Sequence, residues 1–229
     1  MDEKTARRGG LVLFDLDGTL VDTTDLILQS FEYTFERHLP GRLPPRDELI
    51  ATFGRSLPET LRELAAGAGV PDPVAFGDTM LDTYREFQHR HHDRLIRSIP
   101  GVEEALAAMA AGGRRLGLVT SKMEPFARRG LRLFGLERYF EVAVFHGDTE
   151  LHKPDPAPLL LAASRAGAPP EQTIYIGDSI HDIAAGRAAG MRTAAVLWGP
   201  FDPAVLLAAG PDLTVAHPTE LTDLEVGGE

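Results

Sequence analysis

The sequence predicts an α/β fold, in which a doubly wound, mostly parallel sheet is interrupted after its first strand by an all-helical insert. Two features of the 229-residue chain support this prediction. From residue 98 onward, short apolar runs alternate with segments of helical periodicity, whereas residues 22–97 contain helical patterns only. Strands that alternate with helices pair in parallel, with right-handed crossovers that place helices on both faces of the sheet.

The predicted strands are short apolar runs bounded by Gly, Asp or Ser. They are LVLF at 11–14, RLGLVT at 115–120, VAVF at 142–145, TIYIG at 173–177, TAAVLW at 193–198 and LTV at 213–215. The segments between the later runs show helical periodicity and end at or near a glycine, which helix C-termini favour. These helices are GVEEALAAMAAGG at 101–113, EPFARRGLRLFGL at 124–136, APLLLAASRAG at 157–167 and DIAAGRAAG at 182–190.

The insert contains helical patterns without a convincing strand. The patterns lie at 25–39, 46–54, 57–69 and 75–96. Ser56 followed by Glu59 predicts a capping box that opens the third of these helices, with Pro58 tolerated in its first turn. We therefore expect a core domain formed by residues 1–21 and 98–229, and a helical domain formed by residues 22–97.

The composition argues against several classes of partner and of chemical site. The formal net charge is −11 and no run of Lys and Arg occurs, so neither nucleic acid nor an anionic membrane is an expected partner. Cysteine is absent, which excludes disulfides, thiolate catalysis and Cys-based zinc sites. The charged N-terminal stretch 1–10 and the lack of a long apolar run argue against a signal peptide or a membrane span. We expect a cytoplasmic protein, either a monomer or a homodimer.

Acidic residues follow two of the predicted strands, at the sheet edge where open parallel sheets bind ligands. Asp15 and Asp17 follow the first strand, and Asp178 and Asp182 follow the strand at 173–177. Carboxylates that are brought together repel one another unless a cation meets them. Oxygen ligands without Cys or an obligatory His suit Mg²⁺, so we expect a magnesium ion at this edge of the sheet.

Polar and cationic residues are expected at the same edge. The strand predicted at 115–120 finishes on the polar stretch Thr120–Lys122, and Lys153 precedes a Pro-initiated helix. The only lysines of this Arg-rich chain are Lys4, Lys122 and Lys153, so two of the three lie in the candidate site. A carboxylate about 4 Å from a phosphate dianion meets roughly 8 kcal/mol of repulsion at an effective dielectric of about 20. A lysine offsets about half of that, and a divalent cation beside it permits phosphoryl transfer to a carboxylate.

These residues resemble the four motifs of the haloacid-dehalogenase-like hydrolase superfamily. DLDGTLVDT at 15–23 is highly specific, and VTSK, KPDP and GDSIHD follow it in the order of that family. The resemblance covers essentially the whole chain, insert included. It implies a Rossmann-like core with a helical cap domain inserted after the first strand, and a small phosphorylated molecule as the substrate.

Carried over residue by residue, the resemblance implies an aspartyl-phosphate mechanism. Asp15 would be the nucleophile, and Asp17 would act first as general acid to the leaving group and then as general base for water. Thr120 and the backbone N–H of Ser121 would hold the phosphoryl oxygens, and Lys153 would neutralise charge. All five positions match the motifs of the family.

The same resemblance implies the metal ligands and the class of reaction. Asp15, the backbone carbonyl of Asp17 and Asp178 would bind Mg²⁺, with Asp182 supporting them from nearby. An aspartate at position 17 favours a phosphatase over a dehalogenase. Protonation of a phosphate-ester oxygen needs an acid, whereas displacement of halide does not.

Two stretches of the predicted cap are similar to bacterial inorganic pyrophosphatases of this fold. They are FGRSLPETL at 53–61 and EFQHRHHDRLI at 86–96, together with DTTDLILQSF after the first motif. The similarity implies pyrophosphate as the substrate, and a small, highly charged substrate needs cationic groups on the cap that closes over it. The candidates are Arg55, Arg90, His89, His91 and His92.

Other functions fit the same motifs. Phosphoglycolate phosphatases and other small-molecule phosphomonoesterases share this architecture and the IPGV junction at 99–102. A sugar-phosphate mutase would use the same nucleophile and acid/base, and a non-catalytic phosphate-binding protein could keep the scaffold. The retention of Asp17, whose task is proton transfer, argues against the last of these.

Simpler interpretations apply to single motifs. DLDGTLVD could be a cation-binding loop of EF-hand type, although it lacks a third acid and follows a strand pattern. GDSIHD could be a strand-to-helix turn with an N-capping acid. His89, His92 and Asp93 share a helical face and could bind a transition metal, contact substrate, or form a solvated surface. Arg55 could face the active site or the solvent.

Overall fold

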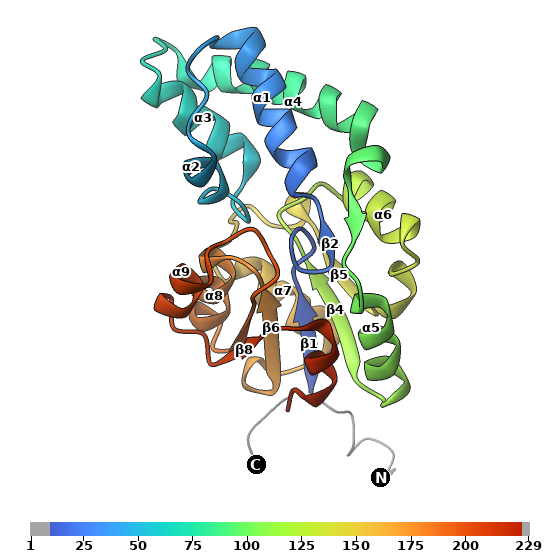
Figure 1. Ribbon diagram of the computed structural model, residues 1–229. Helices are drawn as coiled ribbons and strands as arrows, with labels where there is room; N and C mark the ends of the chain where they lie inside the picture. Colours follow the sequence, from blue (N-terminus) through green and yellow to red (C-terminus); the bar gives the residue numbers. More distant parts are fainter. Residues whose placement is uncertain (1–9, 226–229) are drawn as a thin grey trace.

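The computed structural model describes residues 10–225, in which a bundle of helices lies over the carboxyl ends of a parallel sheet (Figure 1). The sequence analysis argues against a signal peptide at residues 1–10. Residues 1–9 of that stretch lie outside the described residues. Within the described range, no helix has the length and apolar character needed to cross a membrane.

Six parallel strands form the sheet, in the order β5-β4-β1-β6-β7-β8. They are β1 Leu11–Phe14, β4 Arg115–Val119, β5 Val142–Val144, β6 Thr173–Gly177, β7 Arg192–Val196 and β8 Leu213–Val215. Each predicted strand is present, with ends that differ by at most two residues from the prediction. The strand order reverses beside β1, which is the position where doubly wound sheets bind their ligands.

Side chains of β1 alternate between the two faces of the sheet, as the period of a strand requires. Leu11 and Leu13 pack with α7 and α8, whereas Val12 and Phe14 pack with α5 and α6. All four side chains are fully buried, so β1 is the centre of the core. The helices are α5 Val102–Ala111, α6 Glu124–Leu133, α7 Ala157–Ala166 and α8 Ile180–Ala188. A short helix that was not predicted, α9 Pro203–Ala208, connects β7 to β8.

The insert consists of helices, as predicted. They are α1 Thr24–His38, α2 Arg46–Ile50, α3 Leu57–Gly67 and α4 Pro73–Leu95. Phe31, Phe35, Leu61 and Met80 form their shared apolar core, which continues onto Ile183 of α8. The insert therefore packs on the sheet part of the molecule through apolar side chains.

A two-stranded ribbon that the sequence did not predict joins the two ends of the insert. β2 Val21–Asp22 and β3 Arg97–Ser98 pair antiparallel, with Val21 opposite Ser98. Strands of two residues are too short for an alternating pattern to reveal. The expected boundaries near 22 and 97 fall in this ribbon, and the division into two domains stays a prediction.

The capping box predicted at Ser56 is absent. Ser56 occupies the N-cap of α3, but its side chain accepts no hydrogen bond from the first turn. Pro58, the second residue of this helix, does not account for the difference, because a capping box uses the N–H groups of Ser56 and Glu59 and both are present. A capping box occurs instead at α8, where the Asp182 N–H donates to Ser179 Oγ and the Ser179 N–H donates to the Asp182 carboxylate.

Candidate active site

The predicted motif residues converge at the carboxyl ends of β1, β4 and β6, on the side of the sheet edge that faces the insert (Figure 1). The Asp15 N–H donates to the Ile176 carbonyl at 2.9 Å, which holds Asp15 beside the end of β6. The Thr120 N–H donates to the Val144 carbonyl at 3.0 Å in the same way. Backbone hydrogen bonds of the sheet thus extend one residue past the strands and position the side chains of the site.

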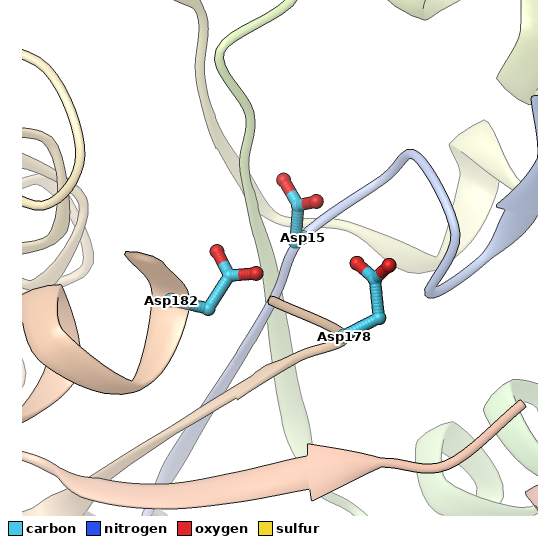
Figure 2. Close-up of side chains that lie close together, drawn as sticks. All are labelled: Asp15, Asp178 and Asp182. Atoms are coloured by element: carbon cyan, nitrogen blue, oxygen red, sulfur yellow. The ribbon is translucent and has the colours of Figure 1, made fainter. Parts of the chain in front are cut away.

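Three buried carboxyl groups face one another at this edge (Figure 2). Asp15 follows β1, Asp178 follows β6, and Asp182 lies in the first turn of α8. One oxygen of each lies within 4.8 Å of the others. Within residues 10–225, this is the only cluster of three or more carboxylate or histidine side chains with the spacing of metal ligands.

The carboxyl groups carry more negative charge than their surroundings offset. Burial raises the pKa of Asp15 to about 7; Lys153 opposes this shift, while Asp182 and Asp17 add to it. Burial also raises the pKa of Asp178 well above its ordinary value, with contributions from Asp182 and Asp15. Neighbouring carboxylates raise each other's pKa unless a cation lies between them. A divalent cation therefore fits this set of oxygen donors.

Lys153 is the cation at the base of the site. Its buried ammonium donates to Asp15 Oδ1 at 2.8 Å, to Asp182 Oδ1 at 2.6 Å and to the Tyr175 hydroxyl at 3.0 Å. Burial lowers the pKa of Lys153, but Asp15 and Asp182 outweigh it and hold the pKa well above its usual value. Lys153 therefore stays charged and offsets one of the carboxylates. Sequence reasoning did not identify Tyr175, which lies inside an ordinary apolar strand pattern.

The three carboxylates differ in the number of hydrogen bonds that their oxygens already accept. Asp182 accepts from Lys153 on Oδ1 and from the Ser179 hydroxyl on Oδ2, at 2.6 Å each. Asp178 accepts from the Thr19 hydroxyl at 3.2 Å. Asp15 and Asp178 thus retain more free acceptor capacity than Asp182. These two residues are the better candidates to hold a cation, and Asp182 orients Lys153.

Asp178 is packed against glycine backbone. Gly18, in the loop after β1, has φ of +80°, and a Cβ at this position would lie 2.3 Å from Asp178 Oδ2. A Cβ on Gly199 would lie 2.5 Å from Asp178 Cβ. Real Cβ atoms do not approach other atoms this closely, so the glycines permit the loops to enclose the carboxylate.

Asp17 pairs with the second lysine of the site. Lys122 Nζ donates to Asp17 Oδ1 at 2.5 Å, and only 8% of the Lys122 side chain is exposed. Both residues line a pocket of about 100 Å³ that also includes Asp15 and Thr120. The insert contributes the opposite wall, with Phe31, Phe53, Arg55, Tyr84, Arg85 and Gln88. The pocket has a charged floor from the sheet and a wall of aromatic, polar and cationic side chains from the helices.

Comparison with known proteins identifies the family. The family model described as haloacid dehalogenase-like hydrolase matches residues 12–196, which include all four motifs. The chain belongs to this family. The relatives of this hydrolase include pyrophosphatase PpaX of Halalkalibacterium halodurans, at 40% identity over 88% of this chain and 94% of the relative. Pyrophosphatase PpaX of Bacillus pumilus is 38% identical over 92% and 93% of the two chains.

A solved structure confirms the fold of this haloacid dehalogenase-like hydrolase. It is the structure of a candidate member of the same family from Bacteroides fragilis, with a TM-score of 0.84 and 27% identity. The match covers 93% of this chain and 99% of that chain. The structural match therefore spans both the Rossmann-like sheet and the helical insert of this chain.

The insert of the hydrolase contacts the loops of the site through two polar bonds. The Ser121 hydroxyl donates to the Gly54 carbonyl at 2.7 Å, and His181 Nε2 donates to the Ala51 carbonyl at 3.0 Å. Gly54 has φ of +86°, and a Cβ there would lie 2.8 Å from Ser179 Oγ. The segment 51–55 thus rests directly on the motif loops of the core.

The cap residues that we proposed as cationic contacts differ in their positions. Arg55 lines the pocket, and its guanidinium pairs with Glu63 at 2.7 Å. Arg90, His89, His91 and His92 do not line it. All four residues lie on α4. Arg90 is solvent-exposed and pairs with Glu86. His92 is buried, and its Nδ1 lies 2.8 Å from the Asp93 carboxylate. The expected histidine contacts with substrate are therefore not supported.

Proposed function

We propose that this hydrolase is a Mg²⁺-dependent phosphatase that hydrolyses inorganic pyrophosphate. The observation that carries the chemistry is the position of Asp15 at the floor of the pocket, with Lys153 at 2.8 Å and the Asp178 carboxylate beside it. The pyrophosphatase name of two relatives that match nearly the full chain favours the anhydride over an ester as substrate.

In the proposed reaction, a carboxylate oxygen of Asp15 attacks one phosphorus of pyrophosphate, and the bond from that phosphorus to the bridging oxygen breaks. Asp17, which in the proposed reaction leaves its ion pair with Lys122 and takes up a proton when substrate binds, gives that proton to the departing phosphate. Thr120 and the Ser121 N–H hold the oxygens of the transferred group, and Lys153 offsets their charge. Water then attacks the aspartyl-phosphate and gives a proton to Asp17. Orthophosphate leaves, and both carboxyl groups return to their starting state.

The donor set supports Mg²⁺ as the cation. Asp15, Asp178 and the Asp17 backbone carbonyl would hold it, with Asp182 orienting Lys153 from below. When bound, the ion would offset the charge of the phosphoryl oxygens, which otherwise repel the attacking carboxylate. The raised pKa values of Asp15 and Asp178 are the features that support a cation at this position.

We further propose that residues 22–97 form a cap domain that opens to admit substrate and closes over it. The contacts of Ser121 with Gly54 and of His181 with Ala51 support a closed arrangement. Closure would exclude bulk water during the attack of Asp15, and the β2–β3 ribbon would be the hinge.

The substrate proposal is tested by steady-state kinetics on the purified protein with Mg²⁺. We expect kcat/KM for pyrophosphate to exceed that for phosphoglycolate and for hexose phosphates. A preference for an ester by tenfold or more would exclude pyrophosphate as the main substrate. Release of an isomerised sugar phosphate would instead assign the protein as a mutase.

The nucleophile is tested by Asp15→Asn, which should abolish turnover without unfolding the chain. Asp25→Asn is the matched control, because Asp25 is exposed on α1 and pairs only weakly with Arg97, at 3.4 Å. We expect this control to keep wild-type activity. If Asp15→Asn also kept it in the presence of Mg²⁺, the assignment of Asp15 would be wrong.

A further inference from the structure

Arg85 differs from the other cations of the pocket in that it lacks a counter-ion. Arg55, Arg85 and Lys122 all line the pocket. Arg55 pairs with Glu63 at 2.7 Å, and Lys122 pairs with Asp17 at 2.5 Å. Within the part of the chain that the structure describes, the Arg85 guanidinium has neither a carboxylate within 4.0 Å nor a hydrogen-bond partner.

Asp15 and Asp17 line the same pocket, but neither forms an ion pair with Arg85. Its neighbours on the pocket side of α4 are Tyr84 and Gln88, which are buried and bonded to each other at 3.3 Å. His146 also lines the pocket, and its Nδ1 is buried without a partner in the described range. Burial, together with His152 and Arg85, lowers the pKa of His146 to about 4, so the ring is neutral at pH 7. The Arg85 side chain is partly exposed and its guanidinium nitrogens reach solvent, so water solvates this cation in the free protein and an anionic ligand in the pocket can replace that water.

We propose that Arg85 binds the second anionic group of the substrate, the one that departs when Asp15 attacks. Asp15 comes from the sheet and Arg85 from the insert, so one pocket holds the attacking group and a free cation on opposite parts of the molecule. A guanidinium presents a planar fork of donors that matches two oxygens of a phosphate or a carboxylate. Arg85 is therefore a specificity-determining residue.

This inference rests on the proposed function only for the identity of the anionic group. Pyrophosphate supplies a phosphate at this position, whereas phosphoglycolate supplies a carboxylate. An aryl ester such as p-nitrophenyl phosphate supplies neither. Substrates with a second anion should gain from Arg85, and the aryl ester should not.

The experiment compares Arg85→Met with Arg90→Met. Both residues lie on α4, but Arg90 is 60% exposed and pairs with Glu86. We expect Arg85→Met to lower kcat/KM for pyrophosphate by about ten- to a hundredfold, mainly through KM, because a charge-assisted hydrogen bond is lost. Activity on p-nitrophenyl phosphate should change by less than about threefold, and Arg85→Lys should restore part of the loss. Arg90→Met should match the wild type on both substrates.

Binding provides a second measurement that does not need turnover. Calorimetric titration with methylene diphosphonate, a non-hydrolysable analogue, should show weaker binding to Arg85→Met and unchanged binding to Arg90→Met. If Arg85→Met lowered kcat/KM equally for pyrophosphate and for the aryl ester, the proposed role of Arg85 would be overturned. Unchanged binding of the analogue to this variant would overturn it as well. If the wild type prefers phosphoglycolate, the proposed function fails. The same comparison on phosphoglycolate then tests Arg85 on its own, and an unchanged KM there would also overturn the inference.

Discussion

Tyr175→Phe should destabilise the fold because it removes a hydroxyl from the charged network under the site. The hydroxyl accepts a hydrogen bond from Lys153 at 3.0 Å and lies within donating distance of Asp182, at 3.0 Å, and of the Val119 carbonyl, at 3.1 Å. The ring is 1% exposed and phenylalanine conserves its packing, so no cavity opens. Hydrogen bonds to charged groups contribute about 1.5–3 kcal/mol each. We therefore expect a loss of about 2–3 kcal/mol in the free energy of unfolding.

Urea denaturation measures this loss. With a slope of about 3 kcal/mol per molar urea, the midpoint should fall by roughly 0.7–1 M. Because Lys153 is less firmly held, kcat should fall while KM changes little. Tyr33→Phe is the control: Tyr33 accepts one bond from Arg37 on the exposed side of α1, and its loss should change stability by less than about 0.5 kcal/mol. A Tyr175→Phe variant as stable as this control would refute the reasoning.

Three further changes should have measurable effects. Gly18→Ala places a Cβ 2.3 Å from Asp178 Oδ2 at a position with positive φ, so it should displace the Asp178 carboxylate. The Mg²⁺ concentration for half-maximal activity should therefore rise at least about tenfold. An unchanged Mg²⁺ titration would contradict this. Ser121→Ala removes the bond to Gly54, so KM should rise about two- to tenfold with little change in melting temperature; an unchanged KM argues against this bond as a closure contact. His146→Phe should reduce sensitivity to acid. The folded-state pKa of His146 is lowered to about 4, so the unfolded chain binds more protons below pH 6.5. Acidification from pH 7.5 to 5.5 should therefore destabilise the wild type by about 1 kcal/mol more than the variant, seen as a larger fall in melting temperature.

The sheet could be predicted because each of its strands is a separate apolar run followed by a turn residue. LVLF at 11–14 is fully buried and lies at the centre, which agrees with the absence of polar residues from the run. The ribbon at 21–22 and 97–98 could not be predicted, since two residues show no periodicity and pairing depends on partners 75 and 77 residues apart. The capping box was predicted at the wrong helix because Ser56 and Glu59 have the right spacing, but spacing alone does not turn the Ser56 side chain toward the first turn, with which it forms no hydrogen bond.

The site was predictable where its residues stand at strand ends and not where a helix supplies them. Asp15, Thr120 and Asp178 follow apolar runs, so topology alone brings them together. Tyr175 and Arg85 lie inside regular elements, in which nothing local separates a residue that faces the site from one that faces the core or the solvent. The three histidines of α4 form a cluster in the sequence, but none of them lines the pocket.

Since Val21 and Ser98 are cross-strand neighbours, the chain departs from the sheet and comes back to it at nearly the same point. Neighbouring strands lie about 4.7–4.9 Å apart, so any segment grafted between them meets an almost fixed end-to-end separation. Additional length there has a small entropic effect, because loop closure depends only weakly on the number of residues. The helical insert between these two strands can thus be replaced by a segment of another length without a change in the register of the six-stranded sheet.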